Sequence, residues 1–168
     1  GLKMLKRANK GTGNWDESDI VPPEGAAGLL WPRMVTGGDN KNTIHVIVLT
    51  SPQANGGALY HGQDGALIYM LSQDGGLSWD KNGVIPGIDS AYYGGWSADR
   101  YSLAEPRNNT LAFAINNTFE DLVLMKSNDN GDTWQKTVVW RYPDQAADMI
   151  YKPDGALSVV IDFNQKVH

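Results

Sequence analysis

The chain has 168 residues, of which 14 are basic and 19 acidic, and its formal net charge is -5. Because the chain is only mildly acidic and has no basic stripe, we expect no nucleic-acid partner. The absence of cysteine excludes disulfides and thiolate metal sites. No apolar run approaches the ~20 residues that a membrane-spanning helix needs, so we expect no membrane insertion.

Short apolar runs between turn sequences predict an all-β chain, because no segment shows sustained helical periodicity. Turn-forming stretches such as Gly37–Asn40 and Lys152–Gly155 precede several of these runs. In chain order the expected strands lie at the start of Met4–Trp15 and at Trp31–Val35, Ile44–Val48, Leu67–Leu71, Gly83–Ile85, Tyr101–Ala104, Leu111–Ile115, Leu122–Lys126, Thr137–Trp140, Asp148–Tyr151 and Leu157–Ile161.

An eight-residue pattern, S-x-D-x-G-x-[ST]-W, occurs twice, and its copies start 55 residues apart. A repeat of that period indicates an array of similar units. The shared positions are Ser72, Asp74, Gly76, Ser78 and Trp79 in the first copy and Ser127, Asp129, Gly131, Thr133 and Trp134 in the second. Asp can accept hydrogen bonds from backbone N–H groups ahead of it, Gly allows a positive φ, and the Trp ring buries apolar area. We therefore predict two hairpin turns, each anchored by a tryptophan.

Each unit has four short strands, which is the composition of a β-propeller blade. Met4–Trp15 looks like a third strand followed by an altered copy of the pattern. We therefore predict part of one β-propeller domain, with about three blades' worth of an incomplete ring. The expected parts are a half blade at 1–22, blades at about 23–90 and 91–143, and a half blade at 144–168. A closed propeller has about 4–8 blades, so we expect a piece of a longer protein. A protomer that closes its ring by association is the alternative.

The repeated pattern resembles the Asp-box, also called the BNR repeat, of sialidase-like β-propellers. The resemblance implies a box between the third and fourth strands of a blade, away from the catalytic face. The family includes glycan-binding and protein-binding members as well as enzymes. It is mostly extracytoplasmic, which implies a secreted or cell-surface protein. The blades also resemble those of large secreted proteins of Bacteroidetes-type bacteria, where such propellers are cargo of a dedicated secretion system. A component of secretion machinery is therefore one expected partner.

Sialidase-like enzymes resemble one another in an arginine triad for the substrate carboxylate, a Tyr/Glu nucleophile pair and an aspartic acid/base. Arg33 is then a candidate for holding the carboxylate, since a guanidinium can do so with two hydrogen bonds. In this chain, however, the proline comes before the arginine, whereas the family has Arg-Ile-Pro. Tyr101 with Glu105 as its base, and Asp99, are the other catalytic candidates. The structural alternatives are that Arg33 pairs with a carboxylate or stacks on Trp31, and that Glu105 belongs to a solvent-exposed turn.

Two loops are candidates for ligand binding. The candidate residues are Tyr92, Tyr93 and Trp96 in one loop and Tyr60 and His61 in the other. In the first loop, between two blades, aromatic rings could stack on a sugar or on a partner's side chain. The second loop is unusually long, and extended loops on rigid scaffolds often carry function. The alternative for the first loop is that it packs to seal the ring. The alternative for the second loop is that it is a tolerated insertion without a function.

Taken together, the sequence predicts a binding or scaffold module for a glycan or a protein partner. The alternative is an exo-sialidase-like glycoside hydrolase whose remaining catalytic residues lie outside this chain, so enzyme activity stays open. We expect no cofactor and no metal. His45 and His168 lack neighbouring metal ligands in the sequence, and a turn explains Asn128–Asp132 better than a calcium loop does.

Overall fold

A computed structural model of the protein describes residues 2–7, 11–37, 40–88, 101–116, 122–140, 147–151, 157–163 and 166–167. For residues 81–82, 116 and 140, and for the strands from 147 onward, it describes the backbone alone. Apart from a 3-10 position at Gly11 and the short 3-10 turn η2 (Gln53–Asn55), the regular structure of these residues consists of β-strands. None of the described segments is a helix long and apolar enough to cross a bilayer.

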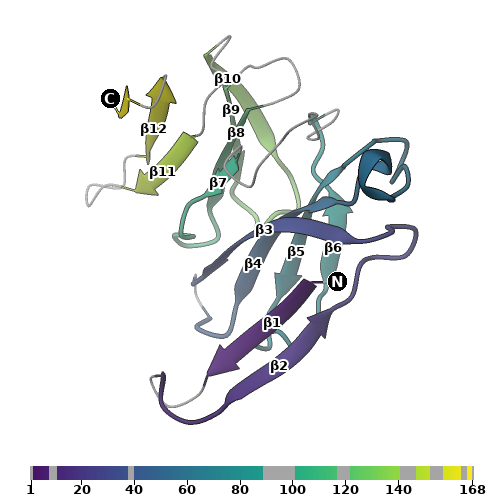
Figure 1. Ribbon diagram of the computed structural model, residues 1–168. Helices are drawn as coiled ribbons and strands as arrows, with labels where there is room; N and C mark the ends of the chain where they lie inside the picture. Colours follow the sequence, from purple (N-terminus) through teal and green to yellow (C-terminus); the bar gives the residue numbers. More distant parts are fainter. Residues whose placement is uncertain are drawn as a thin grey trace.

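The strands follow one another closely along the chain (Figure 1). They are β1 (Leu2–Arg7), β2 (Trp15–Ile20), β3 (Leu29–Thr36), β4 (Ile44–Thr50), β5 (Leu67–Ser72), β6 (Lys81–Val84), β7 (Tyr101–Leu103), β8 (Leu111–Asn116), β9 (Leu122–Ser127), β10 (Gln135–Trp140), β11 (Ala147–Tyr151), β12 (Leu157–Phe163) and β13 (Lys166–Val167).

Among the described residues these strands form antiparallel sheets in which each strand pairs with the next. The sheets are β1-β2, β3-β4-β5-β6, β7-β8-β9-β10 and β11-β12-β13. The prediction of an all-β chain with four-stranded antiparallel units is therefore confirmed. The two-residue strand β13, which pairs with the end of β12, was not expected from the sequence.

The central strands are buried on both faces, which explains why they read as continuous apolar runs. Every residue of β4 and of β5 is buried. Successive side chains of a strand point to opposite faces. Ile47 and Leu49 therefore belong to one core cluster, and Val46 and Val48 belong to another. Burying such a side chain fully contributes roughly 1.5–3 kcal/mol.

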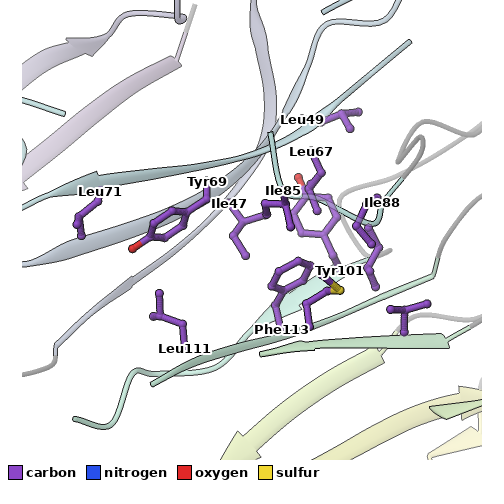
Figure 2. Close-up of a cluster of buried hydrophobic side chains, with 13 residues drawn as sticks. Ile47, Leu49, Leu67, Tyr69, Leu71, Ile85, Ile88, Tyr101, Leu111 and Phe113 are labelled. Carbon is purple, nitrogen blue, oxygen red and sulfur yellow. The ribbon is translucent and has the colours of Figure 1, made fainter. Parts of the chain in front are cut away.

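The two clusters join neighbouring sheets. The first cluster, between β3–β6 and β7–β10, combines residues such as Ile47, Tyr69, Leu111 and Phe113, and Figure 2 shows these side chains converging. The second cluster places Met4 and Ile20 of the β1-β2 hairpin against the opposite face of β3–β6. Each sheet is thus stabilised mainly by its neighbours in the chain, as expected for a repeat protein.

The first strands of successive sheets lie close to one another. β3 packs against β7, and β11 packs against β7 and β8. Figure 1 shows the sheets following one another, from β1-β2 in purple to β11-β12 in yellow. The first strands of consecutive sheets thus lie on a common inner side, which is the arrangement that a β-propeller requires.

Candidate functional site

The first repeat turn, Ser72–Trp79, closes around the carboxylate of Asp74. Asp74 Oδ1 accepts hydrogen bonds from the Ser72 hydroxyl at 2.8 Å and from the backbone N–H of Ser78 at 2.9 Å. The Ser78 hydroxyl donates to Asp74 Oδ2 at 2.6 Å, and the N–H of Gly76 donates to Ser72 Oγ at 2.8 Å. These hydrogen bonds, with that from the Ser78 side chain as the largest cause, hold the pKa of Asp74 well below its usual range.

The second repeat turn, Ser127–Trp134, repeats this arrangement. Asp129 Oδ1 accepts from the Ser127 hydroxyl at 2.7 Å and from the N–H of Thr133 at 2.9 Å. The Thr133 hydroxyl donates to Oδ2 at 2.5 Å, and the N–H of Gly131 donates to Ser127 Oγ at 2.8 Å. The hydrogen bond from the Thr133 side chain contributes most to lowering the pKa of Asp129 to about 2. Both carboxylates are therefore engaged by their own turns, and they act in these turns as structural groups.

The tryptophans of the two turns pack into different clusters. Trp134 lies edge-on to Tyr69 and to Phe113, with ring centroids 5.7 Å and 5.3 Å apart. Trp79 packs against the second cluster, and its indole Nε1 is buried without an acceptor among the described residues. The two rings attach their turns to the cores, which is the role that the pattern predicts for them.

Arg33 and Tyr101 meet where β3 packs against β7. Nε of Arg33 donates to the backbone carbonyl of Tyr101 at 3.1 Å, and the Tyr101 hydroxyl donates to the backbone carbonyl of Trp31. Trp31 lies at an irregularity in the β3–β4 pairing and has a φ of 51°. The two hydrogen bonds together join one sheet to the next, and we call this arrangement the β3–β7 clamp.

Burial of Tyr101 does not suit the nucleophile role considered from the sequence. Its side chain is 0% exposed, and this burial raises its pKa even though the charge of Arg33 acts in the opposite direction. Glu105, the candidate base, is exposed and lies beside Gly37 after the end of β3. Additional sheets could only cover Tyr101 further. The third candidate of this group, Asp99, lies outside the described residues.

The long loop of residues 51–64 is compact. Tyr60 and Gln63 exchange two backbone hydrogen bonds of 2.9 Å and 3.0 Å, and Asp64 accepts from the backbone N–H of Gln53 at 2.7 Å. Tyr60 is buried in the second cluster, so its ring anchors the loop and does not present a binding surface. His61 is exposed and lies edge-on to the Tyr60 ring. The other binding candidates, Tyr92, Tyr93 and Trp96, lie outside the described residues.

A hollow of about 260 Å³ lies between the two four-stranded sheets, beside the second repeat turn. Its lining consists of Tyr69, Asp80, Gly83, Val84, Pro86, Gly131, Asp132 and Trp134. The Tyr69 hydroxyl is 2.8 Å from Nδ1 of the buried His45. Burial, and secondarily the charge of Asp132, raise the pKa of Tyr69. An aromatic wall with two carboxylates nearby is suited to a hydroxyl-rich or cationic ligand.

Sequence reasoning missed this hollow because it brings together residues from two units. The pattern itself offers a weak signal, since Asp80 directly follows the first tryptophan and Asp132 occupies a variable position of the second copy. Nothing in the sequence shows that β6 and the second repeat turn face each other. In the parts of the chain that the structure describes, no three His, Asp or Glu side chains gather closely enough to hold a metal ion.

Neither a protein-family model nor a curated protein matches the sequence. Solved structures do match the fold, among them two of NanB sialidase. One is the K499G mutant of NanB sialidase from Streptococcus pneumoniae, with 19% identity and a TM-score of 0.63, and the match covers 98% of this chain and 24% of that one. The other is NanB with optactamide, with 19% identity and a TM-score of 0.60, covering 95% of this chain and 23% of that one.

These matches and the sheet order define the fold as that of an all-β chain built from β-propeller sheets. More particularly, the sheets have the fold of a sialidase propeller. The chain spans about a quarter of the length of the sialidase chains that it matches.

Proposed function

We propose that the chain is part of an Asp-box β-propeller that serves as a binding or scaffold module, with a glycan as its first expected ligand. The two repeat turns are its Asp-boxes, because each closes around an aspartate with the same hydrogen bonds. The likeness to sialidase structures supports the choice of a glycan. A protein partner is the other outcome that the experiment below distinguishes.

The β3–β7 clamp is the observation that carries this proposal. In a sialidase-like enzyme the arginine must face the substrate carboxylate and the tyrosine must reach the sugar. Here Arg33 Nε is used to hold the backbone of Tyr101, and the Tyr101 hydroxyl is used to hold Trp31. Both groups thus stabilise the contact between two sheets, which favours a non-catalytic role for this part of the propeller.

The proposed binding surface is the aromatic loop that contains Tyr93 and Trp96, with the exposed His61 as a second candidate. A glycan array probed with the full protein tests it. Stacking on an aromatic ring contributes about 0.5–1.5 kcal/mol, so Trp96→Ala should weaken binding roughly 2- to 12-fold. Leu77→Ala, at a side chain that is 83% exposed on the first repeat turn, is the matched control and should leave affinity unchanged. Capture of a protein with no glycan signal would support the scaffold form, and equal effects of both variants would contradict the loop.

A sialidase-like glycoside hydrolase is the second candidate, favoured by the match of 98% of this chain to NanB sialidase. In that case the remaining catalytic residues lie outside this chain. Hydrolysis of a fluorogenic sialoside by the full protein separates the two candidates. A binding module gives no turnover. An enzyme gives turnover, and Tyr101→Phe then distinguishes a catalytic Tyr101, which would abolish turnover, from the structural Tyr101 described above, which would lower stability first.

The proposal extends to location. The Asp-box family is mostly extracytoplasmic, so we propose a secreted or cell-surface protein carried by a bacterial secretion system, with a component of that machinery as a transient partner. Fractionation of the source cells tests this part separately from glycan binding. Recovery from the culture medium or the cell surface would support export, and recovery from the cytoplasm alone would contradict it.

A further inference from the structure

The hollow beside the second repeat turn exists because one position of β6 has no side chain. Gly83 pairs with Tyr69 in the β5–β6 ladder. Residues directly opposite each other in an antiparallel pair place their side chains on the same face of the sheet. A Cβ at Gly83 would meet no heavy atom within 4 Å. The open space beside the Tyr69 ring is therefore the place where a side chain of β6 would otherwise lie.

The backbone does not account for a glycine at this position. Gly83 is not among the glycines with a positive φ, and the pairing of β5 with β6 continues from Ile68 to Leu71 without a bulge. A glycine inside a strand weakens the strand, and it often marks a place where a ligand approaches closely. Because the backbone gives no reason for this glycine, the open space itself points to a bound group.

The walls of the hollow come from two sheets and are held in place. Gly131 of the second repeat turn approaches the Tyr69 ring so closely that a Cβ there would overlap it. Nζ of Lys136 donates to the backbone carbonyl of Gly87 at 2.7 Å, which joins β10 to the segment after β6. The Tyr69 hydroxyl lies 2.8 Å from Nδ1 of the buried His45. The hollow is thus largely preformed, as sites for small ligands usually are.

The charged side chains of the described lining are the carboxylates of Asp80 and Asp132. Both residues are exposed. The charge of Asp132 helps to raise the pKa of Tyr69, so its carboxylate lies close enough to act on the tyrosine hydroxyl. An ionised carboxylate accepts hydrogen bonds and donates none. The bound group must therefore supply donors, and a positive charge on that group adds electrostatic attraction.

Trp134 adds an aromatic surface to these two carboxylates. Its ring is half-buried and lies edge-on to Tyr69 at a centroid distance of 5.7 Å. A guanidinium group stacks on aromatic rings and can bind a carboxylate with two N–H groups, whereas an ammonium group is compact and more strongly hydrated. A sugar can also stack, but its hydroxyl groups bring no charge. The lining therefore suits a guanidinium group best.

The size of the hollow also suits a single side chain. Its volume of about 260 Å³ lies just below the roughly 300–1,000 Å³ of sites for drug-sized molecules. We propose that the hollow binds a guanidinium group, carried by an arginine side chain of a partner protein. The group stacks on Trp134, and Asp80 and Asp132 accept its N–H groups. This site goes beyond the proposed glycan binding, because it uses none of the residues of the aromatic loop.

Isothermal titration calorimetry on the full protein tests the ligand. The probe is a short capped peptide of glycines with a single arginine, and its control is the same peptide with citrulline, which has the same shape without the charge. The citrulline peptide should bind roughly tenfold more weakly, because it loses the attraction to both carboxylates. No saturable binding of the arginine peptide, or equal binding of the two peptides, would overturn the proposal.

Titration with free arginine distinguishes a partner protein from a small ligand with the same chemistry. Free arginine carries the same guanidinium group, but it also brings a carboxylate that Asp80 and Asp132 would repel. Binding of the peptide that is at least as tight as that of free arginine supports a protein partner. Tighter binding of free arginine would overturn that part of the proposal.

Two substitutions test the place of binding. Gly83→Phe puts a ring into the open space of a strand, where aromatic residues are favoured, so the variant should fold and lose detectable binding of the arginine peptide. Asp80→Asn should weaken binding roughly 2- to 5-fold, as expected for an exposed ion pair. Asp16→Asn, at an exposed position of β2, is the matched control and should leave affinity unchanged. Equal affinity of the two asparagine variants would overturn the proposal even if Gly83→Phe does not fold.

The glycan array separates this site from the proposed glycan surface. Gly83→Phe should keep any glycan signal of the full protein, because its ring fills the hollow and leaves the aromatic loop unchanged. A failed arginine site is thereby distinguished from a failed glycan site. Loss of the glycan signal in folded Gly83→Phe would assign the hollow to a sugar and overturn the proposal.

Discussion

The two repeat turns have nearly the same hydrogen bonds but different neighbours. In each turn an aspartate accepts from two hydroxyl groups and from backbone N–H groups. Against the first glycine lies the flexible end of Met4, and against the second lies the rigid ring of Tyr69. The second tryptophan also contacts two aromatic rings. The polar part of the pattern therefore defines the turn, and the apolar neighbours determine how firmly it is held.

The difference shows which features of the pattern can vary without loss of the fold. Tyr69 combines packing on Gly131 with a hydrogen bond to the buried His45. Met4 can only pack, and thioether side chains adapt to irregular gaps. We call the contact of Met4 with Gly76 the first joint and that of Tyr69 with Gly131 the second joint. The second joint is thus expected to be more rigid than the first, and substitutions should affect the two joints unequally.

The largest effect is expected from filling the glycine of the second joint. At a positive φ, alanine costs roughly 1–2 kcal/mol, and overpacking against the Tyr69 ring adds roughly 1–3 kcal/mol. Gly131→Ala should therefore lower the free energy of unfolding by about 3 kcal/mol in urea titrations. Gly76→Ala should cost less, because the end of Met4 can move aside.

Gly62→Ala is the matched control for this series. Gly62 has a φ of 79° and no heavy atom within 4 Å of its Cβ position, so only the backbone penalty of roughly 1–2 kcal/mol applies. The expected order of destabilisation is Gly131, Gly76 and then Gly62. Equal losses of unfolding free energy at all three positions would show that contact with Met4 or Tyr69 adds nothing to the cost of placing alanine at a positive φ.

An intermediate effect is expected from the side chains that enter the joints. Tyr69→Phe removes the hydroxyl that lies 2.8 Å from His45 Nδ1, and leaving a buried polar partner costs about 1–3 kcal/mol. Met4→Leu keeps the volume and should cost less than about 1.5 kcal/mol. Thermal unfolding of both variants measures the difference. If Met4→Leu loses more stability than Tyr69→Phe does, our ranking of the two joints is reversed.

The smallest effect concerns acid pH and should be shared by both turns. The folded pKa of Asp129 is lowered from 3.8 to about 2, and that of Asp74 is lowered in the same direction. A lowered folded pKa stabilises the fold above the unfolded pKa, and this stabilisation is lost as the pH falls through the folded value. Unfolding measured between pH 5 and pH 2 should therefore be less acid-sensitive for Asp129→Asn and for Asp74→Asn. If the stability of both variants depends on pH as that of the unchanged chain does, the hydrogen bonds to the two carboxylates do not stabilise the fold.

The strands and the turns could be predicted from the sequence because their signals are local. The apolar run at Leu67–Leu71 and the pattern that follows it lie within one hairpin. Whether a tyrosine is buried or faces a channel is a different kind of question. In the sequence, Tyr101 and Tyr60 look the same as tyrosines that bind a ligand. Only the packing of other strands around them places both side chains in the core.

The contacts between sheets could not be predicted because they join residues far apart in the chain. Met4 meets Gly76, and Arg33 meets the backbone of Tyr101. The left-handed φ of Trp31 has no local signal either, since tryptophan rarely adopts that conformation. The sequence therefore predicts the strands and turns within a unit well. It predicts the contacts between units poorly.

The burial of β4 and β5 on both faces has a consequence for synthesis of the protein. The face toward β1 can be covered once Val84 has left the ribosome, whereas the opposite face waits for Phe113 and Met125. Those residues emerge up to roughly 40 residues later, which at about 5–20 residues per second means roughly 2–8 s. During that interval an apolar sheet face is open to chaperones and to other nascent chains.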